Sequence, residues 1–143
     1  MNRALIFLLA VLGSAPLVAV PAPPRTLRLA GPATNTTAEV TAIMHLTLVI
    51  DGGRLTAQLQ TDAPLTGSGQ LAGRIAGGWC ELEGRLAEGF ELKLRGVINE
   101  RDFRGIYLAA PGGQPLQYGK FILTVQSVPA PPAPPAQPAP KKK

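Results

Sequence analysis

The chain has 143 residues, enough for one domain of ordinary size, and its formal net charge is +5. From Ala38 to Ser127, however, eight basic residues are balanced by nine acidic ones, so this part of the chain is nearly neutral. A nucleic-acid groove needs clustered basic side chains, so we expect no nucleic-acid partner. With one cysteine, Cys80, an internal disulfide bond is excluded and the core must be held by packing.

Residues 1–19 predict a secretory signal peptide. Arg3 is followed by the apolar run ALIFLLAVLG and then by the small, proline-containing stretch SAPLVAV, which is the order found in signal sequences. Because the apolar run is too short to span a bilayer, we expect cleavage after Ala19 and no membrane span in the mature protein. An uncleaved membrane anchor is the alternative. We therefore expect an exported protein, either periplasmic or extracellular.

A proline-rich segment, residues 20–37, is expected to precede the folded domain, which we place at residues 38–127. In this domain apolar and polar residues alternate in short runs separated by glycine-rich breaks, the pattern of antiparallel strands. Helix is nearly absent, since even the one candidate, residues 36–45, is rich in β-branched residues. Seven strands are predicted, at residues 40–50, 54–61, 69–75, 79–86, 90–98, 102–109 and 118–127, with an eighth conceivable at residues 26–29.

This pattern predicts an all-β fold, an antiparallel meander of seven or eight short strands that forms a small closed or nearly closed barrel. A flattened β-sandwich is the alternative. A three-residue loop, Ala87-Glu88-Gly89, fixes one register. It sets three outward pairs of opposite charge face to face: Arg85 with Glu91, Glu83 with Lys93, and Glu81 with Arg95.

The same counting places several glycines on the inner, apolar face of the strands. These are Gly73, Gly84, Gly96 and Gly105. A strand glycine costs about 0.5–1 kcal/mol relative to alanine, so its inward position needs a reason. Either neighbouring leucines lean over the glycines, or the sheet coils sharply there, as a small barrel requires. Room for a ligand is the less favoured reading.

An enzyme is not expected. His45 is the one histidine and lies on the outward face, Cys80 points inward, and the carboxylates Glu81, Glu83 and Glu91 already have basic neighbours. Catalysis would need a nucleophile, a base and an orienting group together, and a zinc site would need several His or Cys ligands. No cofactor and no metal are therefore predicted.

Two noncatalytic functions remain. The first is an envelope scaffold or protein-interaction module, with Trp79 as an outward contact unless the loop at 110–115 or the N-terminal segment covers it. Its Pro/Ala-rich tail, residues 128–143, is expected to be disordered and extended, and it would carry Lys141, Lys142 and Lys143 to an anionic envelope surface or protein. A solubilising tail without a function of its own is the alternative. The second is a small barrel that binds an apolar molecule, lined by Leu82, Leu94, Phe103 and Tyr107. The sequence does not indicate an oligomeric state.

Overall fold

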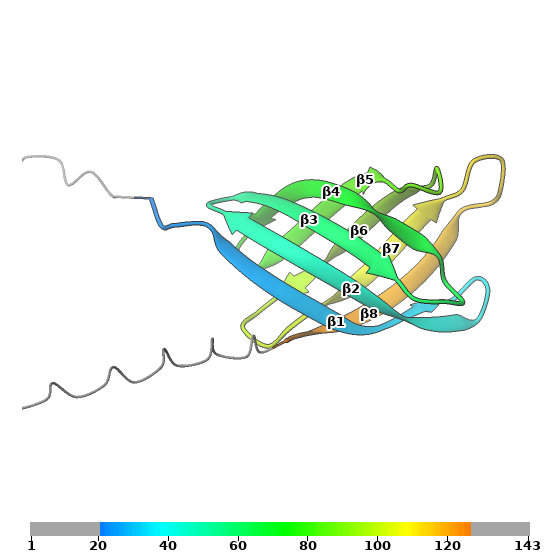
Figure 1. The fold of residues 1–143 in the computed structure, drawn as a ribbon, viewed down its shortest axis with the longest axis horizontal. Helices are drawn as coiled ribbons and strands as arrows, with labels where there is room; N and C mark the ends of the chain where they lie inside the picture. The colour runs from blue at the N-terminus through cyan, green and yellow to red at the C-terminus, as the bar shows by residue number, and fades with distance from the viewer. Residues whose placement is uncertain (1–20, 127–143) are drawn as a thin grey trace, which may run out of the picture.

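The structure, a computed structural model, describes residues 21–126, and the regular secondary structure of these residues is entirely β-strand. Each strand pairs with its neighbours along the chain, and the first also pairs with the last, so the sheet closes on itself (Figure 1). The expected all-β closed meander is confirmed. The strands are β1 (Arg25–Asn35), β2 (Val40–Asp51), β3 (Arg54–Thr61), β4 (Gly67–Ala76), β5 (Trp79–Arg85), β6 (Glu91–Ile98), β7 (Asp102–Ala110) and β8 (Gln117–Val125).

The first strand is longer than the sequence pattern indicated. β1 pairs with β2 along its whole length, so the barrel begins at Arg25, inside the segment that we expected to precede the domain. The sequence pattern did not predict this strand in full, because Gly31 and Pro32 both interrupt a strand pattern. Proline lacks an N–H donor, and the ladder between β1 and β8 skips these two residues. The predicted signal peptide and the tail at residues 128–143 lie outside the described residues.

The up-and-down order of the strands gives the barrel two different ends. One, here called the terminal end, carries both ends of the described chain and the turns after β2, β4 and β6 (Figure 1). The other, the loop end, carries the connections after β1, β3, β5 and β7. Features at the terminal end therefore lie close to the points where residues 20 and 127 continue the chain.

The register predicted from the Ala87-Glu88-Gly89 loop is confirmed. Gly89 has a φ of 89°, and the amide of Leu86 donates to the carbonyl of Phe90 at 2.7 Å. All three charged pairs lie opposite each other. Two of them form ion pairs, Lys93 Nζ to Glu83 Oε2 at 3.3 Å and Arg95 Nε to Glu81 Oε1 at 3.5 Å.

The barrel interior is filled by side chains from every strand. In this core the rings of Phe103 and Phe121 meet edge to face, with their centroids 4.8 Å apart, an arrangement that aromatic pairs prefer. Leucines of the same core cluster are almost completely buried. They include Leu29, Leu46, Leu48, Leu55, Leu59, Leu82, Leu94 and Leu123.

The inward glycines mark places where neighbouring backbones come too close for a side chain. Gly96 is buried and lies opposite Gly105 on β7, while Gly73 and Gly84 are half-buried. A Cβ added at Gly96 would fall on the carbonyl oxygen of Arg104. A Cβ added at Gly73 would fall on the carbonyl oxygen of Glu81 on β5. The curvature explanation therefore holds, because backbone occupies most of the vacated space.

At other glycines, a neighbouring side chain also occupies part of the space that a Cβ would need. The Cδ2 atom of Leu71 would lie 3.0 Å from a Cβ at Gly84. On β8, the ring of Tyr107 covers Gly119, its direct partner across the β7–β8 ladder. An aromatic ring packed over a strand glycine protects the backbone that the missing side chain leaves bare.

We expect Gly96→Ala to destabilise the barrel. The new methyl group would collide with backbone, and overpacking of this kind costs about 1–3 kcal/mol. Gly112→Ala is the matched control, because a Cβ there meets nothing within 4 Å. Urea unfolding should show a lower midpoint for Gly96→Ala than for Gly112→Ala. Equal midpoints would contradict the close-approach explanation.

Candidate functional site

The side chains predicted to line an internal ligand site are sealed in the core. Leu82, Leu94 and Phe103 are each no more than 1% exposed, and Tyr107 is 6% exposed. Burial raises the pKa of the Tyr107 hydroxyl to about 12. The structure thus brings the four side chains together, as packed core.

A small pocket does open at the loop end of the barrel. It holds about 60 Å³ between side chains that include Leu65, Leu86, Phe90 and Tyr107. Asn35 and Gln117 line its rim, where the Nδ2 of Asn35 donates to the Oε1 of Gln117 at 2.7 Å. Sites for drug-sized ligands usually hold about 300–1,000 Å³, so this pocket could take only a very small molecule.

Cys80 points inward, as its register predicted, and is fully buried. Removal from solvent raises the pKa of its thiol from 9.0 to about 11. A reactive cysteine needs the opposite, since positive charge and exposure lower the pKa of a thiol. Cys80 therefore acts as a small apolar core residue.

His45 lies on the outer face, also as predicted, and pairs with Asp62. Its Nε2 is 3.2 Å from Asp62 Oδ2, and both side chains are about half exposed. Among residues 21–126, no hydroxyl or thiol forms a hydrogen bond with His45. The contact is thus an exposed side-chain hydrogen bond, of a kind that contributes little to stability.

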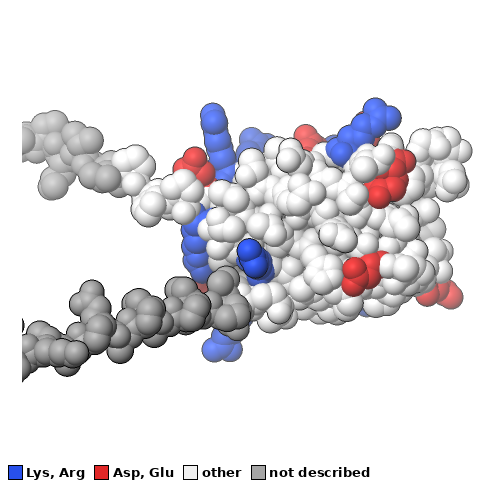
Figure 2. Space-filling model, in the orientation of Figure 1, with Lys and Arg blue, Asp and Glu red and all other residues white. Residues whose placement is uncertain are grey.

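Charged side chains are dispersed over the outer face rather than gathered into a site. Figure 2 shows one side of the molecule, on which a few positive and negative groups are scattered over a mostly uncharged surface. Within the described part of the chain, no cluster of three or more His, Cys, Asp or Glu residues could hold a metal ion. Residues 21–126 also contain no helix that could cross a membrane.

The outward side chain of Trp79 is open to solvent. β5 begins with this residue directly after the turn formed by Gly77 and Gly78, whose φ angles are 56° and 81°. Trp79 is 49% exposed and lies opposite Ala76 on β4 and Val97 on β6. The loop at 110–115, which was one candidate cover for Trp79, lies at the loop end, whereas Trp79 lies at the terminal end.

Trp79 belongs to a row of outward side chains that crosses four strands. Direct cross-strand partners, with Cβ atoms about 4.5–5.5 Å apart, lead from Trp79 to Val97, then to Arg104 and then to Ile122. Val97 is 48% and Ile122 is 52% exposed. We call these four residues the Trp79 row.

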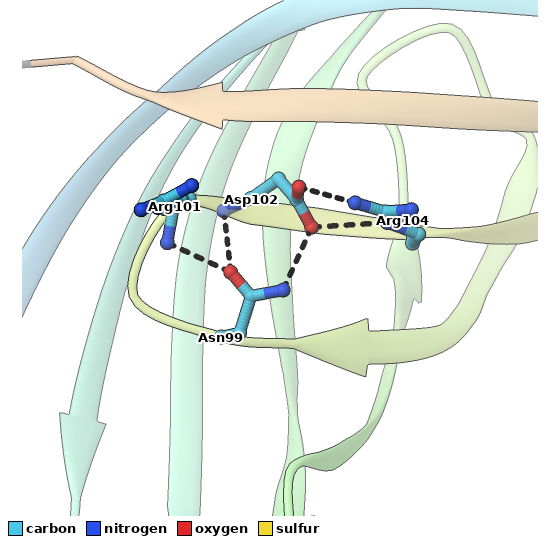
Figure 3. A network of polar contacts seen from close by, with 4 residues as sticks. All are labelled: Asn99, Arg101, Asp102 and Arg104. Atoms are coloured by element: carbon cyan, nitrogen blue, oxygen red, sulfur yellow. Dashed lines mark hydrogen bonds and ion pairs between the residues drawn. The ribbon is translucent and has the colours of Figure 1, made fainter.

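Arg104 is held in this row by the turn between β6 and β7 (Figure 3). Its Nε donates to Asp102 Oδ1 at 3.0 Å, and a second guanidinium nitrogen binds the other oxygen of the same carboxylate. Asn99 completes the network, because its Oδ1 accepts from the amides of Arg101 and Asp102 at 2.7 and 2.9 Å. Asp102 precedes Arg104 by two residues on the same face, so it draws the guanidinium toward the turn.

Sequence reasoning placed Trp79 beside Val97 on the outer face, but it did not extend the row to Arg104 and Ile122, and it missed the polar contacts. The turn at residues 99–102, Asn-Glu-Arg-Asp, could have predicted the Asn99 network, since an asparagine side chain commonly accepts a hydrogen bond from the backbone amide two residues on. The contact of Glu88 with Ser68, at 3.1 Å from its Oε2 to the Ser68 amide, joins a loop to β4 and has no local signal. This backbone hydrogen bond lowers the pKa of Glu88.

A second exposed apolar region lies on the outside of β7 and β8, nearer the loop end. Ile106 is 63% and Tyr118 is 55% exposed. With Tyr107, Leu108 and the basic residues Lys93 and Arg95, they line a groove of about 310 Å³. Both basic residues are already engaged by glutamates of β5, so the groove offers apolar contact more than charge.

Comparison of the chain with family models, with curated proteins and with solved structures finds no match in any of the three.

We expect the Cys80 thiol to react slowly in the folded protein. A pKa about two units higher than usual lowers the thiolate fraction near pH 8 about a hundredfold, and burial adds a steric barrier. Reaction with a chromogenic disulfide reagent should be complete within minutes in urea and at least about a hundredfold slower without it. A Cys80→Ser, Thr47→Cys double variant, with its thiol at an exposed position, is the control. Equal rates in the folded wild type and this control would contradict the assignment.

The Asp102 network predicts a pH-dependent contribution to stability. The hydrogen bond from Arg104 holds the pKa of the Asp102 carboxyl below its usual value. The contribution should be present in full above the pKa of an unfolded aspartate, about 3.9, and be lost as the pH falls through the lower folded value. Asp102→Asn should therefore destabilise the protein near pH 6–7, and the difference should shrink below about pH 4.

Glu100→Gln, in the same turn, controls for the change in net charge. Unfolding in urea at several pH values measures the effect. A difference between wild type and Asp102→Asn that grows as the pH falls would contradict the network.

Proposed function

We propose that the protein is an exported, noncatalytic interaction module that makes contact through the outer face of its barrel. The observation that carries this proposal is the Trp79 row, in which three apolar side chains stand about half exposed outside a filled core. Large aromatic residues dominate the binding energy of many protein interfaces. A partner that covers Trp79, Val97 and Ile122 would remove their apolar surface from water.

The ends of the barrel support an envelope location for this contact. The Trp79 row begins at the terminal end, near the point where residue 127 continues toward Lys141, Lys142 and Lys143. Clustered lysines are attracted to anionic polymers and lipid head groups. A module held at such a surface by its tail would keep the Trp79 row close to proteins of the same surface. The N-terminal signal-like segment supports export.

The second candidate, binding of a small apolar molecule, is less well supported. The side chains that would line an internal site are packed in the core, and the pocket at the loop end holds about 60 Å³. A ligand of ordinary size would have to displace core leucines.

The test is a capture experiment with the protein from residue 20 onward as bait and an envelope extract as the source of partners. Trp79→Ala should abolish capture of a specific partner. Tyr118→Ala is the matched control, because it removes a similarly exposed aromatic residue elsewhere on the outer face. If Trp79→Ala and the wild type capture the same proteins in the same amounts, the proposal fails for this surface. Substituting Lys141–Lys143 by glutamine should separately weaken association with anionic surfaces at low salt.

A further inference from the structure

The segment that follows the barrel contains a three-residue repeat. Residues 129–140 read Pro-Ala-Pro four times, with Gln137 as the one departure. A polyproline II helix has three residues per turn. In that conformation one face would consist entirely of proline, namely Pro129, Pro132, Pro135 and Pro138, and a second face entirely of alanine, namely Ala130, Ala133, Ala136 and Ala139.

The Trp79 row has the chemistry that recognises such a helix. Proline-rich segments bind to surfaces lined by aromatic and apolar side chains, and little conformational entropy is lost because proline already restricts the chain. Trp79, Val97 and Ile122 provide half-exposed apolar groups across neighbouring strands. Asp102 draws the Arg104 guanidinium toward the turn, so the row is not interrupted by a free charge at its centre.

We propose that residues 128–140 dock as a polyproline II helix along the Trp79 row of the same molecule. The point of departure is fixed, since the amide of Gln126 donates to the carbonyl of Arg28 at 2.7 Å at the terminal end. Ile122 lies four residues back along β8, and Trp79 lies three strands away from β8. The path along the row runs about 13 Å back to Ile122, at about 3.3 Å per residue, and then about 14 Å across three strands to Trp79, at about 4.8 Å per strand. About nine residues of polyproline II chain, at about 3.1 Å each, cover this path.

Linkage to the barrel favours the tail of the same molecule over other occupants. A segment joined by a short linker has an effective concentration of about 1 mM, so even an intrinsic dissociation constant of about 1 mM would keep the row half occupied. The tail of a second copy would compete only at its lower solution concentration. The other proline-rich stretch, residues 21–24, is itself exposed to solvent.

Docking would remove the apolar surface of the row from water. It would also hold Lys141–Lys143 beside the barrel instead of at the end of an extended chain. The inference concerns the same surface as the proposed function but requires no envelope partner. Its test uses purified protein alone, so each can fail without the other.

Trp79 is the single tryptophan of the chain, so its fluorescence reports docking directly. Three forms of the protein from residue 20 onward are compared: wild type, a proline-face variant with Pro129, Pro132, Pro135 and Pro138 changed to Ser, and an alanine-face variant with Ala130, Ala133, Ala136 and Ala139 changed to Ser. If the row is at least half occupied, acrylamide quenching of Trp79 should be at least about twofold stronger in the proline-face variant than in wild type. The alanine-face variant should resemble the wild type.

A second variant tests the barrel side of the contact. Ile122→Ser lies two strands beyond the nearest neighbour of Trp79 in the row, so it should raise quenching only by releasing the tail. Far-ultraviolet circular dichroism confirms that each variant keeps the barrel. Equal quenching in wild type and the proline-face variant would overturn the proposal. A wild-type signal that changes with protein concentration between 1 and 100 μM, on the order of typical assay concentrations, would overturn docking within one molecule and assign the row to a second copy.

Discussion

The structure depends on how closely neighbouring strands approach on the inner side of the curved sheet. A barrel of few strands must curve strongly, and its backbones come together on the inside of the curve. At Gly96 and Gly105, which face each other, and at Gly31 on the seam with β8, any side chain would meet a neighbouring carbonyl group. Glycine is thus required there despite its entropic cost, and the alternation of leucines around it follows from the same geometry.

This tight curvature has consequences for chemistry. A narrow interior holds only packed side chains, and Cys80 and Tyr107 are buried there with pKa values raised by desolvation. Most charged side chains are left on the outside, where they form exposed ion pairs such as Lys93 with Glu83 and Arg95 with Glu81. This is why the contact surface that we propose lies on the outer face of the barrel.

Much of the fold could be read from the sequence, because short loops determine register. The Ala87-Glu88-Gly89 loop allows only one register between β5 and β6, and the three charged pairs across these strands followed from it. β1 was largely missed, since Gly31 and Pro32 break its pattern although tertiary pairing with β2 supports the strand. Local propensity carries no information about a partner strand that lies far away in the sequence.

The candidate site was predicted only in part, for a related reason. Trp79 could be placed outward by alternation, and Val97 by the adjacent hairpin. Ile122 could not be joined to them, because the connection between β7 and β8 is long and does not fix a register. A site that is spread across strands becomes visible only when every ladder between them is known.

The seam between β1 and β8 also affects how the chain reaches its native state. It joins residues that are some ninety positions apart, such as Ala30 with Thr124, whereas every other ladder joins neighbours in the sequence. Loop closure makes such a contact the last and slowest to form. Until β8 is available, β1 and β7 are open edges that can recruit other chains. Completion of the last nine strand residues, Gln117–Val125, therefore converts an aggregation-prone curved sheet into a cylinder without edges.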